Sequence, residues 1–431
     1  MIVFFLLIAV TIPFVCIASN KIKNKHIVFD HEIVFSIGYL YYWILPMLVG
    51  ILIDDDVNEG TVQFWYSFFS RLGEGQKEIF LLICMLFYCA YMLGSRAAIV
   101  GHIHHIKNEG KREINDIDLG YTFLTMLILP AFFYVAWKIQ PYLFGGYTAG
   151  WGDNAWWETK GMLATLLLVS FAIYYMYTLR HWNYSKSVFK NLQNRYAILY
   201  LTCSIMMLST GGRLYFMTTV ISLIVFYGVY LQKLTIKKMA IVAIMGLTFA
   251  GMIGIVRQAQ SESGDVWLAI GANIILEPAL TSISSMTFIQ SNDLPILADV
   301  KYPLSLFINL LPSFLFRDLR NEISVDLETE YDIESPLGAL SSFVSWIGYF
   351  GILGSLAGLF IFGFLLSILK NRTDSTSHVI YGMLCGATMF TFFRDQFNIS
   401  LIKIMIQDSV LAPLFIFIII KCTNKIFGYK R

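Results

Sequence analysis

Long apolar runs separated by short polar segments dominate the chain. An α-helix needs about 20 apolar residues to cross a bilayer, and it must satisfy every backbone polar group internally. Runs that approach this length predict helices at 2–19, 33–53, 79–95, 120–138, 161–179, 196–210, 214–231, 239–256, 339–368, 377–393 and 398–420. The run 196–210 is short and meets the next at a tight turn, Ser209-Thr210-Gly211-Gly212. The pattern therefore predicts an all-α, polytopic transmembrane bundle of about 11 helices.

The composition supports this class. Of 431 residues, 57% are hydrophobic and only 14% are charged, whereas a soluble domain carries about 25% charged residues. The net charge of +2 gives no basic field that would favour nucleic acid as a partner. The six cysteines lie in apolar runs or near a predicted cytoplasmic end and form no CxxC pair, so neither a disulfide framework nor a metal site is expected. The first run lacks a basic leader and a small-residue cleavage site, which predicts a helix and not a signal peptide.

The distribution of positive charge predicts the orientation. With the N-terminus outside, the cytoplasmic connections are roughly 20–32, 96–118, 180–195, 232–238 and 369–376, plus the tail from Lys421. These segments hold 20 of the 31 Lys and Arg residues but only 7 of the 29 Asp and Glu residues. Lys and Arg concentrate on the cytoplasmic side of membrane proteins. The bias therefore predicts an external N-terminus and a cytoplasmic C-terminus.

One long loop, 257–338, then lies on the outer side between helices in 1–256 and helices in 339–431. Loops longer than about 15 residues usually carry function. Two segments inside it are apolar but poor candidates for crossing the membrane: 266–290 contains Glu277-Pro278, and 303–316 is short and broken by Pro312. We expect both to lie along the interface or to re-enter the bundle.

Arginines on the predicted outer side are candidate ligands for an anion. Arg213 follows the Gly211-Gly212 turn, Arg257 ends the run GMIGIV, and Arg394 ends MFTFF. A single arginine at a helix end is commonly an anchor that reaches the interface. Three on the side that lacks positive charge favour a bound anion, because the guanidinium is a planar, permanently charged donor for phosphate.

Glu277 lies in the otherwise apolar segment ANIILEPALTSISSM. Burial would make it a candidate general base or acid, and the plainer interpretation is a partner for one of the arginines. We expect Lys403 and Asp408 in the last run to pair within the bundle. The acidic run of the loop is predicted to be solvated surface and consists of Asp318, Glu322, Asp326, Glu328, Glu330, Asp332 and Glu334.

Other common catalytic features do not occur on the predicted outer side. All seven histidines fall on or near the predicted cytoplasmic side, so none is available outside as a base or a zinc ligand. The chain contains no Walker A, GxSxG or HExxH pattern, which leaves ATP-driven transport and the common hydrolases without support. We expect no metal and no other cofactor.

Four segments together resemble the oligosaccharide repeat-unit polymerases of the Wzy type, which make O-antigen and capsule. They are LSTGGRLYFMTTVISLIVFYGVY, GIVRQAQ, SPLGALSSFVSWIGYFGILGSLAGLFIFG and FFRDQF, with the long loop before the third. The resemblance spans roughly 195–400, and residues 1–190 match only in hydropathy. It implies a metal-independent glycosyltransferase of the bacterial inner membrane with a GT-C-like fold and a large periplasmic loop.

The resemblance also implies substrates, partners and roles. Such an enzyme transfers a glycan from undecaprenyl pyrophosphate onto a new undecaprenyl-pyrophosphate-linked repeat unit, beside a chain-length regulator and a flippase. Arg213, Arg257 and Arg394 would bind the pyrophosphate, and Glu277 would activate the acceptor hydroxyl. Arg317 or Arg320 would hold the second lipid.

Two alternatives remain. An O-antigen ligase resembles the polymerases in layout but relies on an outer histidine, which the predicted topology does not supply. A lipid-linked oligosaccharide flippase or another transporter would typically have short loops and repeat symmetry. The chain instead has one dominant loop and no apparent repeat, which favours the polymerase.

Overall fold

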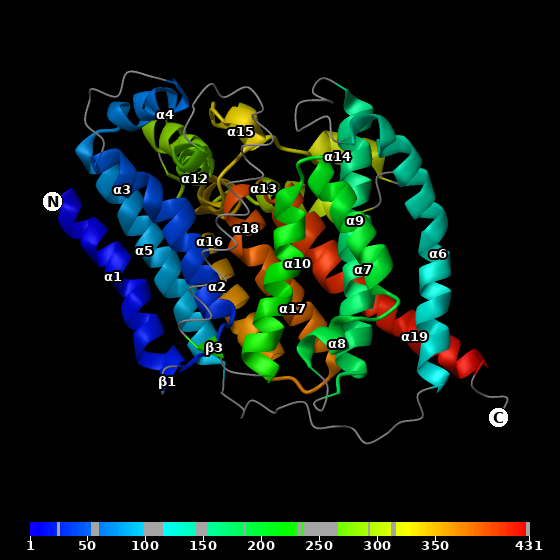
Figure 1. Cartoon of the computed structure of the whole chain (residues 1–431). Coiled ribbons are helices and arrows are strands. Elements are labelled where there is room, and N and C mark those ends of the chain that lie inside the picture. Colours follow the sequence, from blue (N-terminus) through cyan, green and yellow to red (C-terminus); the bar gives the residue numbers. More distant parts are fainter. Residues whose placement is uncertain are drawn as a thin grey trace.

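The computed structural model is a bundle of helices, most of them side by side (Figure 1). It describes the whole chain apart from 24–25, 53–59, 99–114, 144–152, 184–186, 232–233, 236–265, 292–293, 312–315 and 428–431. Within the described residues, seven segments are long and apolar enough to cross a membrane: His31–Leu52, Glu74–Ala97, Leu119–Tyr142, Ala155–Arg180, Arg213–Tyr230, Ser342–Lys370 and Asn398–Ile426. The predicted class, a helical bundle with several membrane-spanning helices, is confirmed.

The helices before the long loop are α1 (Ile2–Lys21), α2 (His31–Gly38), α3 (Leu45–Leu52), α4 (Gly60–Arg71), α5 (Glu74–Ala97), α6 (Asn115–Ile139), α7 (Asn154–Arg180), α8 (Val188–Leu192), α9 (Ala197–Ser209) and α10 (Arg213–Phe226). Those that follow are α12 (Val266–Ser291), α13 (Lys301–Phe307), α14 (Arg317–Ile323), α15 (Leu327–Glu330), α16 (Ser342–Lys370), α17 (Ser375–Met389), α18 (Thr391–Arg394) and α19 (Ala412–Phe427). Wider π-helical turns form η1 (Tyr39–Ile44), η3 (Tyr227–Leu231) and η6 (Asn398–Leu411), which continue α2 into α3, extend α10 and lead into α19. Short 3₁₀ turns form η2 (Gln140–Tyr142), η4 (Ile308–Leu310) and η5 (Pro336–Gly338).

Ten of the eleven predicted runs fall on these helices, and the run 239–256 lies outside the described residues. The runs 196–210 and 377–393 correspond to α9 and to α17 with α18. At 13 and 15 residues, α9 and α17 are shorter than the length needed to span the hydrocarbon. The interrupted segment 266–290 forms α12, a helix of 26 residues that continues through Pro278.

The run 339–368 differs from the single straight helix that its apolar pattern predicts. The helix α16 breaks at Gly351, where φ is +70°. A Cβ there would lie 2.7 Å from the backbone nitrogen of Ala298, so the loop backbone packs directly against the break. Carbonyl oxygens of Pro295 and Ile296 accept hydrogen bonds from the next two amides, at 2.9 and 3.0 Å. Amides freed by the break are therefore satisfied by the long loop, which fixes the loop to the bundle.

The two ends of the bundle carry different segments (Figure 1). The helices α4, α12, α14 and α15 lie at one end, while α8 and the last part of α19 lie at the other. A small antiparallel sheet at this second end joins β1 (Ile22–Lys23), β2 (His26–Ile27) and β3 (Leu234–Thr235). These strands come from the predicted cytoplasmic connections 20–32 and 232–238. The structure thus groups predicted outer segments at one end and predicted cytoplasmic segments at the opposite end.

A buried polar network joins helices near the second end. Lys370 at the end of α16 pairs with Asp30, the N-cap of α2, at 2.6 Å. His31 contacts the Tyr381 hydroxyl through Nδ1 at 3.0 Å and the Ser95 hydroxyl through Nε2 at 2.8 Å. Ser95 in turn donates to Glu32 at 2.7 Å. Because buried polar groups need partners, these bonds fix α2 against α5, α16 and α17.

Candidate functional site

Glu277 is positioned by α12, whose polar side chains fasten it to neighbouring elements. The Ser282 hydroxyl accepts a hydrogen bond from Trp65 Nε1 of α4 at 3.0 Å. The Ser284 hydroxyl accepts one from the backbone amide of Ser341 at 2.9 Å, just before α16. These bonds hold the helix above the bundle and orient the Glu277 carboxylate toward it.

Arg213 is positioned by the turn between α9 and α10, which confirms the tight turn expected from the Gly pair. Gly211 adopts φ +78°, a conformation that glycine accepts at no steric cost. A Cβ on Gly212 would lie 2.2 Å from the terminal methyl of Met207, so the second glycine allows a close approach. Helix α10 then begins at Arg213, and its guanidinium forms an ion pair with Glu277 through Nη2 and Oε2.

Arg394 reaches the same carboxylate from the far end of the sequence. Its Nε lies 3.4 Å from Glu277 Oε1, and its Nη1 lies 3.5 Å from Asp395 Oδ1. The Tyr42 hydroxyl, from η1, donates to Glu277 Oε1 at 3.3 Å. One carboxylate therefore joins α12 to α10, α18 and η1, and we call Arg213, Glu277, Arg394 and Asp395 the arginine–carboxylate cluster.

The cluster is largely buried but not sealed from solvent. The exposed fractions of the four side chains are 12%, 14%, 21% and 16% for Arg213, Glu277, Arg394 and Asp395. Burial raises the pKa of Asp395 above its ordinary range, the neighbouring Glu277 raises it further, and Arg394 opposes the shift. Two guanidinium groups face two carboxyl groups, so the formal charges cancel when both carboxyls are ionised. Such compensation is what a buried set of charges requires.

The cluster can exchange one anion for another. Guanidinium groups bind carboxylate and phosphate in the same planar, two-bonded geometry. An incoming phosphate group would therefore compete with Glu277 for Arg213 and Arg394. Displacement would leave the carboxylate with the Tyr42 hydroxyl and without its cations, and such a carboxylate is a stronger proton acceptor.

Of the predicted site residues, the structure brings together Arg213, Glu277 and Arg394. The plainer interpretation of Glu277, an arginine partner, is confirmed, and it holds two arginines and not one. Arg257 lies outside the described residues. Arg317 and Arg320 belong to α14, at the same end of the bundle, and their side chains are outside the described part of the structure.

The acidic run of the loop is confirmed as largely solvated surface. Only Glu328 of its seven members is half-buried, and the other six are exposed. Asp326 caps α15 by accepting hydrogen bonds from the Glu328 amide at 3.3 Å and the Thr329 hydroxyl at 2.8 Å. None of these residues joins the arginine–carboxylate cluster in the described structure.

The expected ion pair between Lys403 and Asp408 does not form, although the two charges interact at longer range. Lys403 Nζ donates instead to the backbone carbonyl of Gly161 at 3.1 Å, and no ion pair joins it to Asp408. Lys403 and Asp408 are five residues apart in η6, and the Lys403 side chain is directed to α7, where the Gly161 carbonyl accepts its hydrogen bond. Sequence reasoning also missed Tyr42, whose apolar surroundings (YLYYWI) resemble those of any core tyrosine.

Comparison of the chain with protein-family models, curated proteins and solved structures finds no match in any of the three.

Proposed function

We propose that the chain is a membrane glycosyltransferase that polymerises undecaprenyl-pyrophosphate-linked oligosaccharide repeat units into O-antigen or capsular polysaccharide. The observation that carries this proposal is the position of Glu277 between Arg213 and Arg394, at the bundle end that the charge bias places outside. The resemblance of 195–400 to repeat-unit polymerases names the reaction. The cluster supplies side chains suited to it.

In this proposal the arginines bind the leaving group. When the glycosidic bond to the donor lipid breaks, negative charge develops on a pyrophosphate oxygen. Fixed cations in a site that excludes water stabilise such charge more than water does. Arg213 and Arg394 come from separate elements and converge on one point, so a pyrophosphate placed there would receive donors from both.

Glu277 is proposed as the base. The acceptor hydroxyl oxygen forms a bond to the anomeric carbon of the donor glycan, and the bond from that carbon to the pyrophosphate oxygen breaks. The electron pair of the broken bond leaves with the lipid pyrophosphate. The proton of the acceptor hydroxyl moves to the Glu277 carboxylate, which later releases it to water. A positioned base contributes about 10²–10⁴-fold to such a transfer.

The ion pairs in the structure without substrate are suited to a site that binds an anionic substrate. Without substrate, Glu277 and Asp395 together neutralise the two arginines next to the membrane, where unpaired charge is costly. When the pyrophosphate takes the arginines, the carboxylate is released for the acceptor. Binding of the donor would thereby switch on the base, and a proton acceptor would be exposed only when a glycan is present to use it.

The proposal includes the expected cell context. We place the protein in the bacterial inner membrane, with the N-terminus and the active end in the periplasm and the C-terminus in the cytoplasm. Its substrates are the two lipid-linked glycans, and its proposed neighbours are a flippase and a chain-length regulator. The proposed chemistry uses the arginines in the electrostatic role that a metal ion has elsewhere, and the fold is proposed to be GT-C-like.

A ligase would need a histidine at the active end, and the described histidines lie elsewhere. His26 is in β2, His31 starts α2, His181 follows α7 and His378 lies in the first turn of α17. These positions belong to the end of the bundle that carries β1 and α8. Within the described residues, the site therefore favours a polymerase over a ligase.

The glycan profile of a deletion strain tests the proposal. A polymerase predicts single repeat units on lipid A and no ladder of longer glycans. Loss of all repeat units from lipid A would indicate a ligase, and repeat units trapped on the cytoplasmic face would indicate a flippase. Arg257→Ala, in the same background, is expected to abolish long polymer while single units still reach the outer leaflet.

A further inference from the structure

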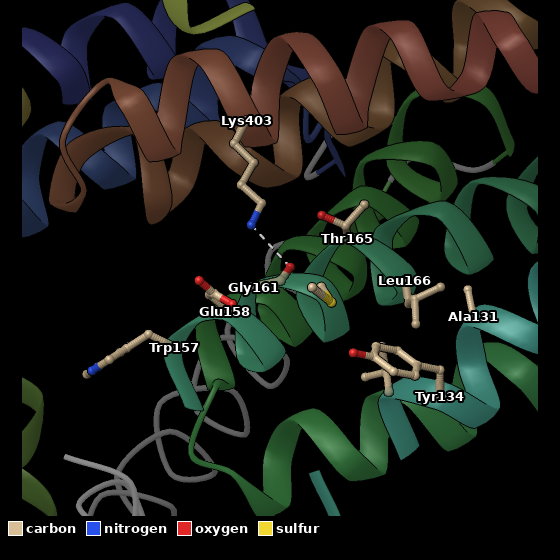
Figure 2. A pocket seen from close by; sticks show the side chains of 10 residues that line it. Ala131, Tyr134, Trp157, Glu158, Gly161, Thr165, Leu166 and Lys403 are labelled. Atoms are coloured by element: carbon tan, nitrogen blue, oxygen red, sulfur yellow. Dashed lines mark hydrogen bonds between the residues drawn. The ribbon is translucent and has the colours of Figure 1, made fainter. Parts of the chain in front are cut away.

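A cavity of about 480 Å³ opens between α6, α7 and η6 (Figure 2), and no residue of the arginine–carboxylate cluster lines it. Five of the residues that line it are polar or aromatic: Tyr134, Trp157, Glu158, Thr165 and Lys403. Apolar side chains line the rest, from Ala131, Val135, Met162 and Leu166. The cavity therefore suits an amphiphile, with an apolar part and a charged head.

Lys403 points into this cavity from η6 (Figure 2). Its ammonium carries three donors, and one of them bonds the Gly161 carbonyl at 3.1 Å. A Cβ on residue 161 would lie only 3.0 Å from Nζ, so glycine leaves room for the ammonium. In the described residues no carboxylate lies within ion-pair distance of Lys403. Asp408 of the same helix interacts with this ammonium electrostatically from beyond ion-pair distance, and an anion bound in the cavity would add a direct contact to it.

The cavity lies near one end of the bundle, where we expect lipid head groups and not the membrane centre. Trp157 and Glu158 lie near the start of α7, and Tyr134 lies near the end of α6. Both of these helix ends are at the end of the bundle that carries α14 (Figure 1). Tyr134 and Trp157 are 51% and 45% exposed, as expected for aromatic residues at a membrane interface.

Glu158 adds a negative charge to the same cavity. Its side chain is exposed and makes no ion pair with Lys403 in the described structure. The neighbouring Lys160 lies over the Trp156 and Trp157 rings and does not line the cavity. The lining of the cavity thus includes one cation and one anion, while Tyr134 lies on its other side, beside Leu166 and Ala131 (Figure 2). A ligand with two or more negative charges would be repelled by Glu158.

We propose that this cavity binds a zwitterionic phospholipid of the adjoining leaflet. The phosphodiester accepts hydrogen bonds from Lys403 and the Thr165 hydroxyl, and the ammonium of the head group lies beside the Glu158 carboxylate. An acyl chain follows Val135, Met162 and Leu166. This binding does not depend on the proposed glycosyltransferase activity, because no residue of the arginine–carboxylate cluster lines the cavity.

Native mass spectrometry of the full chain tests the proposal. The protein is placed in nanodiscs with equal parts of phosphatidylethanolamine and phosphatidylglycerol, released, and examined for retained lipid. We expect wild type to retain phosphatidylethanolamine. Lys403→Met should retain at least about tenfold less phosphatidylethanolamine, since a hydrogen bond to a charged group is removed. Lys301→Met, a matched change at an exposed lysine that pairs with Glu330, should lose none.

Glu158→Gln is an independent variant at an exposed position, and it tests the proposal even if Lys403→Met does not fold. Without the carboxylate, the preference should shift from phosphatidylethanolamine toward phosphatidylglycerol. Equal retention of both lipids by wild type, a wild-type preference for phosphatidylglycerol, or an unchanged preference in Glu158→Gln would each overturn the proposal.

Discussion

Glu277 on α12 and Arg213 at the start of α10 form an ion pair across 64 residues of sequence. The pair joins the long loop, which is predicted to be outside, to the helical bundle, and Arg394 binds the same carboxylate from α18. Both arginines therefore contact the same carboxylate and lie next to each other. Predictions about function depend on this geometry.

Replacing Arg213 by Lys should abolish long polymer although the charge is kept. Lysine cannot form two parallel hydrogen bonds to a phosphate or carboxylate, so it stabilises the leaving group less well. We expect the polymerisation rate to fall by about a hundredfold. The measurement is the glycan ladder of a deletion strain that carries the variant. Arg195→Lys is the matched control, because Arg195 is exposed and its Nη2 bonds Thr122 at 3.1 Å, away from the cluster. A full glycan ladder with Arg213→Lys would contradict this and would show that Arg213 only anchors the start of α10.

The buried ion pair between Asp30 and Lys370 should show a strong double-mutant effect. Asp30 is fully buried and Lys370 is 11% exposed, so removing one partner leaves a buried charge alone. Asp30→Asn or Lys370→Met should each lower the free energy of unfolding by about 3–5 kcal/mol. The double variant should recover much of the loss, because neither charge then remains. Thermal unfolding in detergent measures all three, and losses that simply add would show that the two residues do not interact.

Two glycines of α5 should respond in opposite ways to alanine. A Cβ on Gly94 would lie 1.9 Å from the carbonyl oxygen of Phe360 in α16, so the two helices pack backbone to backbone there. Gly94→Ala must push them apart and should destabilise the fold by at least about 1–3 kcal/mol. Gly75→Ala meets no atom within 4 Å and should be neutral or stabilise the helix by up to about 1 kcal/mol. Equal unfolding temperatures for both variants would contradict this packing.

The predicted orientation can be checked with native and introduced cysteines. Cys422 is exposed on α19 near the C-terminus, at the end predicted to be cytoplasmic. A membrane-impermeant maleimide should label it only after the inner membrane is opened. Thr329→Cys, at an exposed position of α15 on the opposite end, should be labelled in intact spheroplasts. The reverse pattern would invert the topology and place the arginine–carboxylate cluster in the cytoplasm.

Much of the helix pattern follows from apolar run length, because a bilayer requires helices that bond their own backbones. The α9–α10 turn was also predictable, since the Gly211-Gly212 pair allows a positive φ and a close approach. The break of α16 at Gly351 was not, because it depends on loop residues distant in sequence that supply the missing bonds.

The candidate site was partly predictable for a similar reason. Ionisable residues are rare in apolar segments, so Glu277, Arg213 and Arg394 stand out in the sequence. Tyr42 does not stand out among apolar neighbours, and only the tertiary structure brings its hydroxyl to the carboxylate. The partner of Lys403 was mistaken because it is a backbone carbonyl on another helix, which no side-chain pattern can indicate.

The role of Glu277 as the base can be measured with purified protein in liposomes and lipid-linked repeat units. Glu277→Gln keeps the size of the side chain and one acceptor oxygen for the arginines but cannot take up a proton at neutral pH. We predict that this variant, assayed well below its own unfolding temperature, loses about 10²–10⁴-fold in polymerisation rate. Glu330→Gln, at an exposed carboxylate of the loop that pairs with Lys301, should keep the wild-type rate. Polymerisation by Glu277→Gln at the wild-type rate would contradict the account.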